Sequence, residues 1–413
     1  SPFDDPAGFV FGESGSENVI KCGSYVGGSA GLEVNVGFEP QFLLIKNSTS
    51  GSTNWLMVDT MRGIVTGGSD ERLYANESSA ESAYDWVDVT STGFKLPTLT
   101  TSVNASGQTY IFLAIRRSDG YVGKPPELGT SVFSMAYGNS AGTNPSYVSN
   151  FPVDFALNRQ PATSEAWYAG ARLIQGKYLL TNETNAEASA SNYLFDHNNG
   201  WRDGSAITNY LSWMWKRHAG FDVVCYEGDG VAGRQIPHNL SKTPEMMWIK
   251  NRSSSNGWIA FHKGLGGGTN PSHKYLQINS NSAEADTTLP FNDTEPTSIN
   301  FTVGGWGLVN NTNDQHIAML FASVDGISKV GSYIGTGSSG NTITVGFQPR
   351  FIIIKNTSRA STSWTVLDTL RGWGSGNDKS LELNDDNAQE TYNYGAPTST
   401  GFTLDETGIW TNY

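Results

Sequence analysis

The stretch GFEPQFLLIKN occupies residues 37–47, and a close copy, GFQPRFIIIKN, occupies residues 346–356. A Gly-Ser-Tyr segment precedes each copy, and a Trp with Asp-Thr-x-Arg-Gly follows it. The offset of about 309 residues is three periods of roughly 103 residues, which predicts two further copies between these two. The accompanying segments are residues 23–27 and 55–63 for the first copy, and 331–335 and 364–372 for the last.

The two middle copies are recognisable from the same pattern. The third is TPEMMWIKN at residues 243–251, followed by Trp258. The second has diverged, because residues 151–158 keep the apolar run but lose the Lys, while Trp167 keeps the aromatic position. The repeats predict an N-terminal segment, 1–18, and four modules: 19–123, 124–220 (divergent), 221–327, and 328–413, which lacks the last strand.

The modules are predicted to be β structure. Residues 42–46 and 351–355 are short apolar runs that end in Lys, as in a strand covered on both faces. Residues 32–36 and 342–345 alternate between apolar and polar, as in a half-buried strand. Turn-forming clusters recur every 8 to 12 residues, and no helical period is evident. We therefore expect an all-β protein of four tandem, divergent β-sandwich or jelly-roll-like modules of about 100 residues.

Composition excludes several classes of function. The net charge of −13 argues against binding to nucleic-acid backbones or anionic membranes. No apolar run approaches the 18 residues of a membrane span, so membrane insertion is not expected. The chain begins without Met or a signal-peptide pattern, which suggests processing or a segment of a longer protein. Cys22 and Cys225 are expected to be buried thiols rather than a disulfide.

Catalytic and metal-binding patterns are weak. The best-kept polar pairs are Asp59 with Arg62 and Asp368 with Arg371, whose spacing most simply gives a salt-bridged turn. No Gly-x-Ser-x-Gly elbow, recurring carboxylate pair or metal-ligand His spacing stands out. We therefore expect no catalytic residues, no metal and no cofactor, and treat sugar binding at the Asp–Arg pairs as the alternative.

Tryptophans fall into two groups. One recurs at a single repeat position and is expected to be buried: Trp55, Trp167, Trp258 and Trp364. The other lies in predicted loops and supplies the candidates for stacking on glycan or packing against a partner chain: Trp86, Trp201, Trp306 and Trp373, together with Trp410. The repeated Lys46, Lys250 and Lys355 are expected to be solvated strand ends.

Several further segments resemble one known family. They are ENVIKCGSY at residues 17–25, AIRRSDGY at 114–121, MWKRHAGFD at 214–222 and IPHNL at 236–240, which Pro244–Met246 follows. Together with the repeated Gly-Phe-x-Pro run, they resemble virion proteins of marine tailed bacteriophages, in particular repeat-bearing appendage or tail-fibre proteins often described as lectin-like. The resemblance covers essentially the whole chain and supplies no established catalytic residues.

The resemblance implies a non-enzymatic structural protein on the virion surface. Its leading expected role is host-surface attachment, with a glycan, other virion proteins and copies of itself as partners. The alternative is a purely structural role in capsid decoration or a filament, and a polysaccharide depolymerase is a minor third reading. The missing strand of the fourth module should be supplied from elsewhere, with residues 9–11 (Phe-Val-Phe) as one candidate and continuation of the native chain as another.

Overall fold

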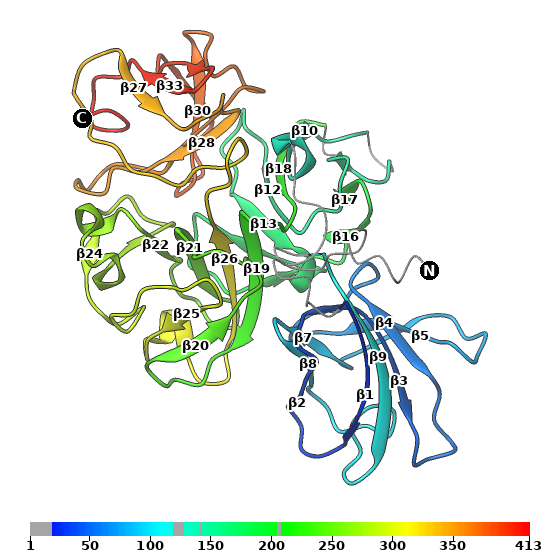
Figure 1. Cartoon of the computed structure of the whole chain (residues 1–413). Helices are drawn as coiled ribbons and strands as arrows, with labels where there is room; N and C mark the ends of the chain where they lie inside the picture. The colour runs from blue at the N-terminus through cyan, green and yellow to red at the C-terminus, as the bar shows by residue number, and fades with distance from the viewer. Residues whose placement is uncertain (1–18, 119–127, 141–142, 205–207) are drawn as a thin grey trace, which may run out of the picture.

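Four antiparallel β-sandwiches make up the protein in a computed structural model, which describes residues 19–118, 128–140, 143–204 and 208–413 (Figure 1). The prediction of an all-β protein is confirmed. Each large sheet takes all its strands from one predicted module. Helices in the described residues are single turns: α1 (Gly307–Asn310) and 3-10 turns at Gly129–Ser131, Arg172–Ile174, Leu265–Gly268 and Pro271–His273.

Module 1 sets the pattern, with a large sheet packed on a small one. The large sheet has the order β1 (Ile20–Val26), β9 (Thr109–Arg116), β3 (Pro40–Asn47), β4 (Leu56–Asp59), β5 (Asp70–Tyr74) and β6 (Ser82–Tyr84). The small sheet has the order β2 (Leu32–Asn35), β8 (Gly93–Leu96) and β7 (Asp88–Thr90).

Module 2 repeats both sheets although its sequence has diverged. Its large sheet runs β10 (Phe133–Tyr137), β18 (Leu211–Trp215), β12 (Phe155–Arg159), β13 (Tyr168–Ala171), β14 (Lys177–Leu180) and β15 (Ala188–Ser189). Its small sheet runs β11 (Tyr147–Val148), β17 (Gly200–Arg202) and β16 (Leu194–His197).

Module 3 has the same large sheet and a reduced small one. The large sheet runs β19 (Phe221–Glu227), β26 (Gln315–Phe321), β21 (Met246–Asn251), β22 (Ile259–His262), β23 (Lys274–Gln277) and β24 (Ala285–Asp286). The small sheet pairs β20 (Arg234–Pro237) with β25 (Asn300–Val303).

Module 4 is shorter by two strands of the large sheet. That sheet runs β28 (Phe351–Ile354), β29 (Thr365–Asp368), β30 (Asp378–Glu382) and β31 (Glu390–Tyr392), and the small sheet runs β27 (Asn341–Thr344), β33 (Gly401–Leu404) and β32 (Pro397–Thr398).

Within the described residues 328–413, module 4 has no counterpart of β9. Residues 331–335, the counterpart of β1, join no sheet there, because β1 pairs only with β9 in module 1. Among the described residues nothing pairs with the free edge of β28. Residues 9–11, the candidate filler, lie outside the described residues.

Equivalent hydrogen bonds show that the four modules are one fold. In each module the backbone N–H of the repeated Trp donates to an Asn side chain that follows the fifth strand of the large sheet or its counterpart, at 2.8 to 2.9 Å. The four pairs are Trp55 with Asn76, Trp167 with Asn182, Trp258 with Asn279 and Trp364 with Asn384.

The large sheet of each module has an inner face, toward its small sheet, and an outer face. In module 1 Leu43 and Ile45 point inward and are fully buried, whereas Leu44 between them points outward and is half-buried. In module 3 the outward Trp248 is as buried as its inward neighbours. Strand β21 is therefore covered on both faces. The prediction of cover on both faces is wrong for β3, whose outer face is only partly covered, and for β28, where residues 351–353 are half-buried.

The outer faces of modules 2, 3 and 4 meet one another and close a ring. The indole N–H of Trp258 in module 3 donates to the carbonyl of Leu180 in module 2 at 2.7 Å. Trp364 in module 4 donates to Gln277 in module 3 at 2.9 Å. Trp167 in module 2 donates to Glu382 in module 4 at 2.7 Å, which completes the circle. The three carbonyls lie at one repeat position, opposite the residue after each Trp.

A second set of equivalent contacts follows the same circle. A backbone N–H of each module donates, at 2.8 Å, to a carbonyl just beyond the apolar strand of the next module. The pairs are Glu187 with Arg252, Glu284 with Thr357 and Gln389 with Pro161. Two independent sets with threefold repetition mean that modules 2 to 4 form an internal pseudo-trimer, which we call the ring.

Burial of the repeated basic residues also comes from the ring. Lys250 is fully buried, and its ammonium donates to the carbonyl of Thr184 in module 2 and to that of Asn256. Strand pairing places Arg159 at the same repeat position, so the basic residue that the second module seemed to lack is an Arg. Its guanidinium donates to the carbonyls of Asp386 and Asn387 in module 4.

The expectation that these basic residues are solvated strand ends is therefore wrong. Lys355 is half-buried and donates within its own module to Thr362, and Lys46 is half-buried and donates to Thr53. The strand ends at which they lie face a neighbouring module or their own turn rather than bulk water.

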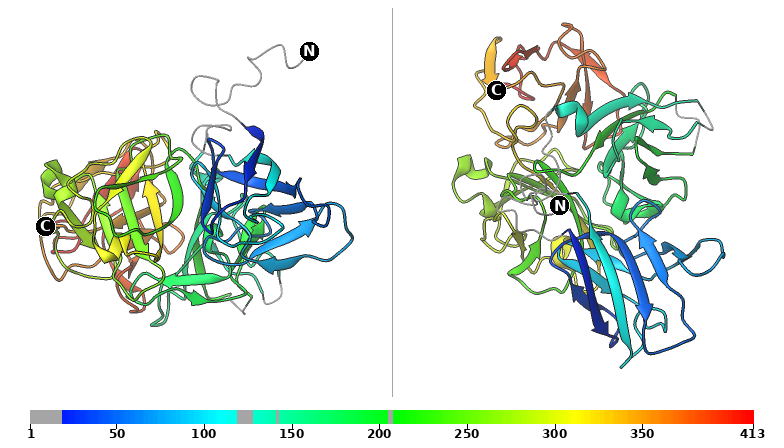
Figure 2. Two further views of the ribbon diagram at one scale, coloured as in Figure 1. Left: turned by 90° about the horizontal axis from the view of Figure 1, so that it is seen from below. Right: turned by 45° about the vertical axis from the view of Figure 1, so that its right-hand side comes forward.

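Module 1 stands outside the ring and is attached to modules 2 and 3, as Figure 1 and the right-hand view of Figure 2 show. A buried ionic cluster joins the three modules through Glu39 and Arg117 of module 1, Arg217 of module 2 and Asp222 of module 3. Glu39 lies 2.9 Å from Arg217 and 3.0 Å from Arg117, and Asp222 lies 2.8 Å from Arg117. Because each buried charge has an opposite partner, the cluster fixes the position of module 1.

Candidate functional site

The four candidate glycan-binding tryptophans are distributed over the modules and do not converge. Trp201 is fully buried, stacked on Phe195 in the interior of module 2 with ring centroids 5.2 Å apart. Trp86 and Trp373 are also buried, in modules 1 and 4. Core packing therefore occupies these three side chains, and in this conformation they offer little ring surface for stacking on a sugar.

Trp306 is the candidate that keeps an accessible ring. It is half-buried and lies edge-on to Tyr275, with ring centroids 5.4 Å apart and an interplanar angle of 76°. Trp410 in module 4 is half-buried as well. Glycan binding by these residues stays a prediction.

The repeated tryptophans are buried at three of their four positions. Trp167, Trp258 and Trp364 are sealed in the ring, whereas Trp55 is half-buried. The expectation of a mostly buried, equivalent site is confirmed for the first three, and Trp55 departs from it because no module covers its outer face.

The Asp–Arg pairs form the turns that their spacing predicts. The guanidinium of Arg62 donates to Asp59 at 2.7 Å, and that of Arg371 donates to Asp368 at 2.6 Å. Each carboxylate also accepts the backbone N–H of its own Arg partner. In module 4 the indole of Trp213 from module 2 donates to Asp368 as well. These groups are engaged in structure, so they leave no open Arg for a ligand.

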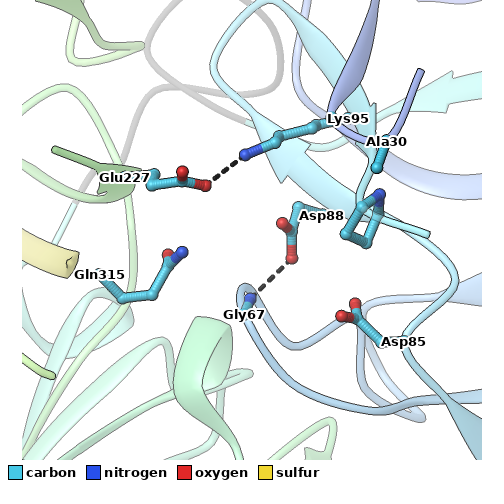
Figure 3. Close-up of a pocket in the computed structure, with 9 residues that line it drawn as sticks. Ala30, Gly67, Asp85, Asp88, Lys95, Glu227 and Gln315 are labelled. Carbon is cyan, nitrogen blue, oxygen red and sulfur yellow. Dashed lines mark hydrogen bonds and ion pairs between the residues drawn. The ribbon is translucent and has the colours of Figure 1, made fainter. Parts of the chain in front are cut away.

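A polar pocket of about 280 Å³ lies between modules 1 and 3 (Figure 3). Its lining combines carboxylates, an amide and an ammonium from both modules, and it includes none of the predicted residues. The lining is Ala30, Gly31, Gly67, Asp85, Asp88, Lys95, Pro97, Glu227 and Gln315.

Hydrogen bonds and ion pairs position the pocket's charges. Lys95 forms an ion pair with Glu227 of module 3, and Asp88 accepts the backbone N–H of Gly67 at 2.7 Å. Gly67 has a φ of 68°, which a residue with a Cβ rarely adopts, so the loop can bring its N–H to Asp88. The pocket thus depends on how modules 1 and 3 are docked.

The two aspartates differ in their surroundings. Burial raises the pKa of Asp85 to about 6, with a further contribution from the nearby Asp88. Burial also raises the pKa of Asp88, although the Gly67 hydrogen bond and Lys95 oppose the change. One Asp85 carboxylate oxygen is buried and has no hydrogen-bond partner among the described residues. The pocket therefore offers carboxylate acceptors beside the Gln315 amide and the Lys95 ammonium, and Asp85 holds a proton mainly below about pH 6.

Within the described residues there is no assembled metal-binding site, and the two cysteines do not form a disulfide. No group of three or more His, Cys, Asp or Glu side chains there is arranged to hold a metal ion. Cys22 is exposed and Cys225 is buried, and both are free thiols. The expectation of two buried thiols is therefore right only for Cys225. Burial lowers the pKa of His218, His262 and His316 to about 4, so these imidazoles are neutral near pH 7.

No helix among the described residues is long and apolar enough to cross a membrane.

One family model matches the chain over residues 9–118 and 175–412, and its description is Domain of unknown function (DUF7483). The chain belongs to this family. No curated protein and no solved structure matches the chain. The match leaves out residues 119–174, which include the start of module 2, in line with the divergence of the second repeat.

Sequence patterns did not reveal the pocket or the ring, because both are built between modules. One signal for the ring was present. The apolar runs lacked alternation, which indicates burial on both faces, and a single sandwich can bury only one of them. The pocket carried no comparable signal, since the residues that the two modules contribute to it lie at least 130 positions apart.

Proposed function

We propose that the chain is a non-enzymatic structural protein of a bacteriophage virion, carried in an exposed appendage or tail fibre, where it attaches the particle to a host-surface glycan. The resemblance to repeat-bearing appendage proteins supports this proposal. So does the use of the repeated residues, which join modules to one another rather than surrounding a reacting group.

The observation that carries the proposal is the pseudo-trimeric ring with module 1 fixed beside it. Such a body is a rigid scaffold, in which loops of four related modules are held at set positions. Weak contacts made by several copies of the chain on a particle would add up to useful avidity.

The pocket between modules 1 and 3 is the best location for a glycan on this scaffold. Its carboxylates, the Gln315 amide and the Lys95 ammonium match the hydroxyl groups of a saccharide in hydrogen-bonding capacity. The half-buried Trp306 belongs to module 3 as well and offers an aromatic ring as a second, separate contact.

A glycan array probed with the whole chain tests this function. The expected result is binding to a restricted group of glycans that falls at least tenfold in Asp88→Asn or Gln315→Ala. The matched control is Asp325→Asn, which changes an exposed carboxylate outside the pocket and should bind as the wild type does. Absence of binding to any glycan, together with location of the chain in an internal part of the particle, would contradict the proposal.

A purely structural role is the second candidate, because the outer face of module 1 is apolar and only partly covered. In capsid decoration or a filament this face would lie against another protein. Absence of binding to every glycan on the array, in the wild type as in the pocket variants, would favour this role, whereas unchanged glycan affinity in the pocket variants would mean that another surface binds the glycan.

A further inference from the structure

The outer face of module 1 matches the three faces that close the ring, but no module covers it. Its residues Leu44, Met57 and Leu73 are half-buried, and Ile111 is 40% exposed. The equivalents in modules 2 and 3 are buried: Leu157, Ala169, Leu179, Leu211, Trp248, Ala260, Leu276 and Ile317. In module 4 Val366 and Leu381 are buried, and Ile353 is half-buried. Half-exposed apolar side chains across a whole sheet face indicate an interaction surface.

The groups that seal the ring are also present in module 1. In each ring interface an indole N–H meets a β-strand carbonyl, and a backbone N–H meets a carbonyl beyond the apolar strand. The counterparts in module 1 are the Trp55 indole, the Tyr74 carbonyl, the Glu81 N–H and the Ser48 carbonyl. Within the described part of the chain, neither the Trp55 indole nor the Glu81 N–H has a hydrogen-bond partner.

Exposure confirms that the matching surface is unoccupied in a single chain. Ala75 is exposed, whereas the residues at its position in modules 2, 3 and 4 are buried against their neighbours. These are Thr181, Ile278 and Leu383. Glu81 is exposed too, whereas Glu187, Glu284 and Gln389 are half-buried.

We propose that three copies of the chain associate through the outer faces of their first modules and reproduce the ring with true threefold symmetry. The number three follows from the ring geometry. Each interface is head-to-tail, with a donor face on one module and an acceptor face on the next, and in the ring three such steps close the circle. Two modules would leave one Trp55 and one Tyr74 carbonyl without partners.

The contacts in the trimer follow from the repeat. Trp55 of one chain donates to the Tyr74 carbonyl of its neighbour. The Glu81 N–H of that neighbour donates back to the Ser48 carbonyl of the first chain. Lys46 matches the ring residue Lys355, because each ammonium donates to the carbonyl and the hydroxyl of the Thr that lies seven residues later, and we expect it to keep this contact in the trimer. The inference rests on the repeat geometry alone and does not depend on the proposed function.

Native mass spectrometry and light scattering of the whole chain test the proposal. The expected mass is three times 44.6 kDa, falling to 44.6 kDa in Met57→Arg, which places a charge in the centre of the face. The matched control is Leu99→Arg, which adds the same charge at a 60% exposed position in the loop after β8 and should stay trimeric. Circular dichroism and a cooperative melting transition establish that the variants fold.

A milder variant separates hydrogen bonding from apolar packing. Trp55→Phe keeps a ring but removes the donor, and should raise the chain concentration at which the trimer dissociates by several-fold. A chain that is monomeric or dimeric at its highest soluble concentration would overturn the proposal. So would a trimer that survives Met57→Arg, because another surface would then hold it together.

Discussion

The large sheets of modules 1 and 3 have the same strand order and share the repeated Trp and Lys, yet their outer faces differ. Trp258 is fully buried and bonded to module 2, whereas Trp55 at the same position is half-buried and its indole has no partner in the described residues. Lys250 reaches across to module 2, whereas Lys46 stays within its own turn. The repeat thus encodes an adhesive face, and the neighbours decide whether that face is used.

This difference separates what a module needs in order to fold from what the ring needs in order to close. The inner faces are apolar in all four modules, because each sandwich requires a core. The outer faces are apolar because modules 2 to 4 meet there, and module 1 has kept the same residues. A substitution on the outer face should therefore have a larger effect in the ring than in module 1.

The largest effect is expected for the ring tryptophan. Trp258→Ala removes a fully buried indole and leaves the Leu180 carbonyl without its donor, so it should lower the free energy of unfolding by about 3–5 kcal/mol. Trp55→Ala at a dilution where the chain is monomeric should cost about 1 kcal/mol or less. Chemical denaturation followed by circular dichroism measures both, and equal losses would remove the distinction between the modules.

The two Asp–Arg turns provide the next comparison. The side chains of Asp368 and Arg371 are both 0% exposed, whereas those of Asp59 and Arg62 are 24% and 21% exposed. Asp368→Asn leaves a buried guanidinium without its counter-charge and should cost about 3 kcal/mol of unfolding free energy. Asp59→Asn should cost about 1 kcal/mol or less, since water screens this pair. Thermal unfolding of the two single variants checks the order, and a larger loss for Asp59→Asn would contradict it.

A smaller effect is expected for Lys250 and depends on pH. Burial lowers the pKa of its ammonium to about 8 from an ordinary value of 10.5. Between these two pH values the unfolded chain holds a proton here that the folded chain has released, so stability rises with pH, by at most about 1.4 kcal/mol per pH unit.

Comparison with Lys250→Met isolates this contribution, because the tyrosines titrate in both proteins. The unfolding free energy of the wild type minus that of the variant should increase from pH 7.5 to pH 9.5. A flat or falling difference would mean that hydrogen bonds to Thr184 and Asn256 outweigh the burial of the charge.

Much of the fold could be predicted from the sequence. Residues 42–46 and 342–344 lie in strands as expected, and the Asp-x-x-Arg spacing predicted the turns correctly, because both depend on local geometry. The position of Arg159 was missed, since a divergent repeat aligns by strand pairing more reliably than by residue type.

Burial of side chains in loops and at strand ends was harder to predict. Trp201 lies among Gly, Asn and Asp, which are typical of an exposed loop, yet it fills the interior of module 2. Lys250 is buried only because module 2 supplies a carbonyl to it. Contacts between modules leave no periodicity in the sequence, so neither the ring nor the pocket between modules 1 and 3 could be derived from the pattern.

Amide hydrogen exchange resolved to single residues tests the ring most directly, with Met57→Arg used to keep the chain monomeric. The account predicts that the N–H groups of Glu187, Glu284 and Gln389 exchange slowly, because each is bonded to the next module, and that the equivalent N–H of Glu81 exchanges rapidly. Equal rates at all four positions would contradict a closed ring of modules 2 to 4 with module 1 outside it.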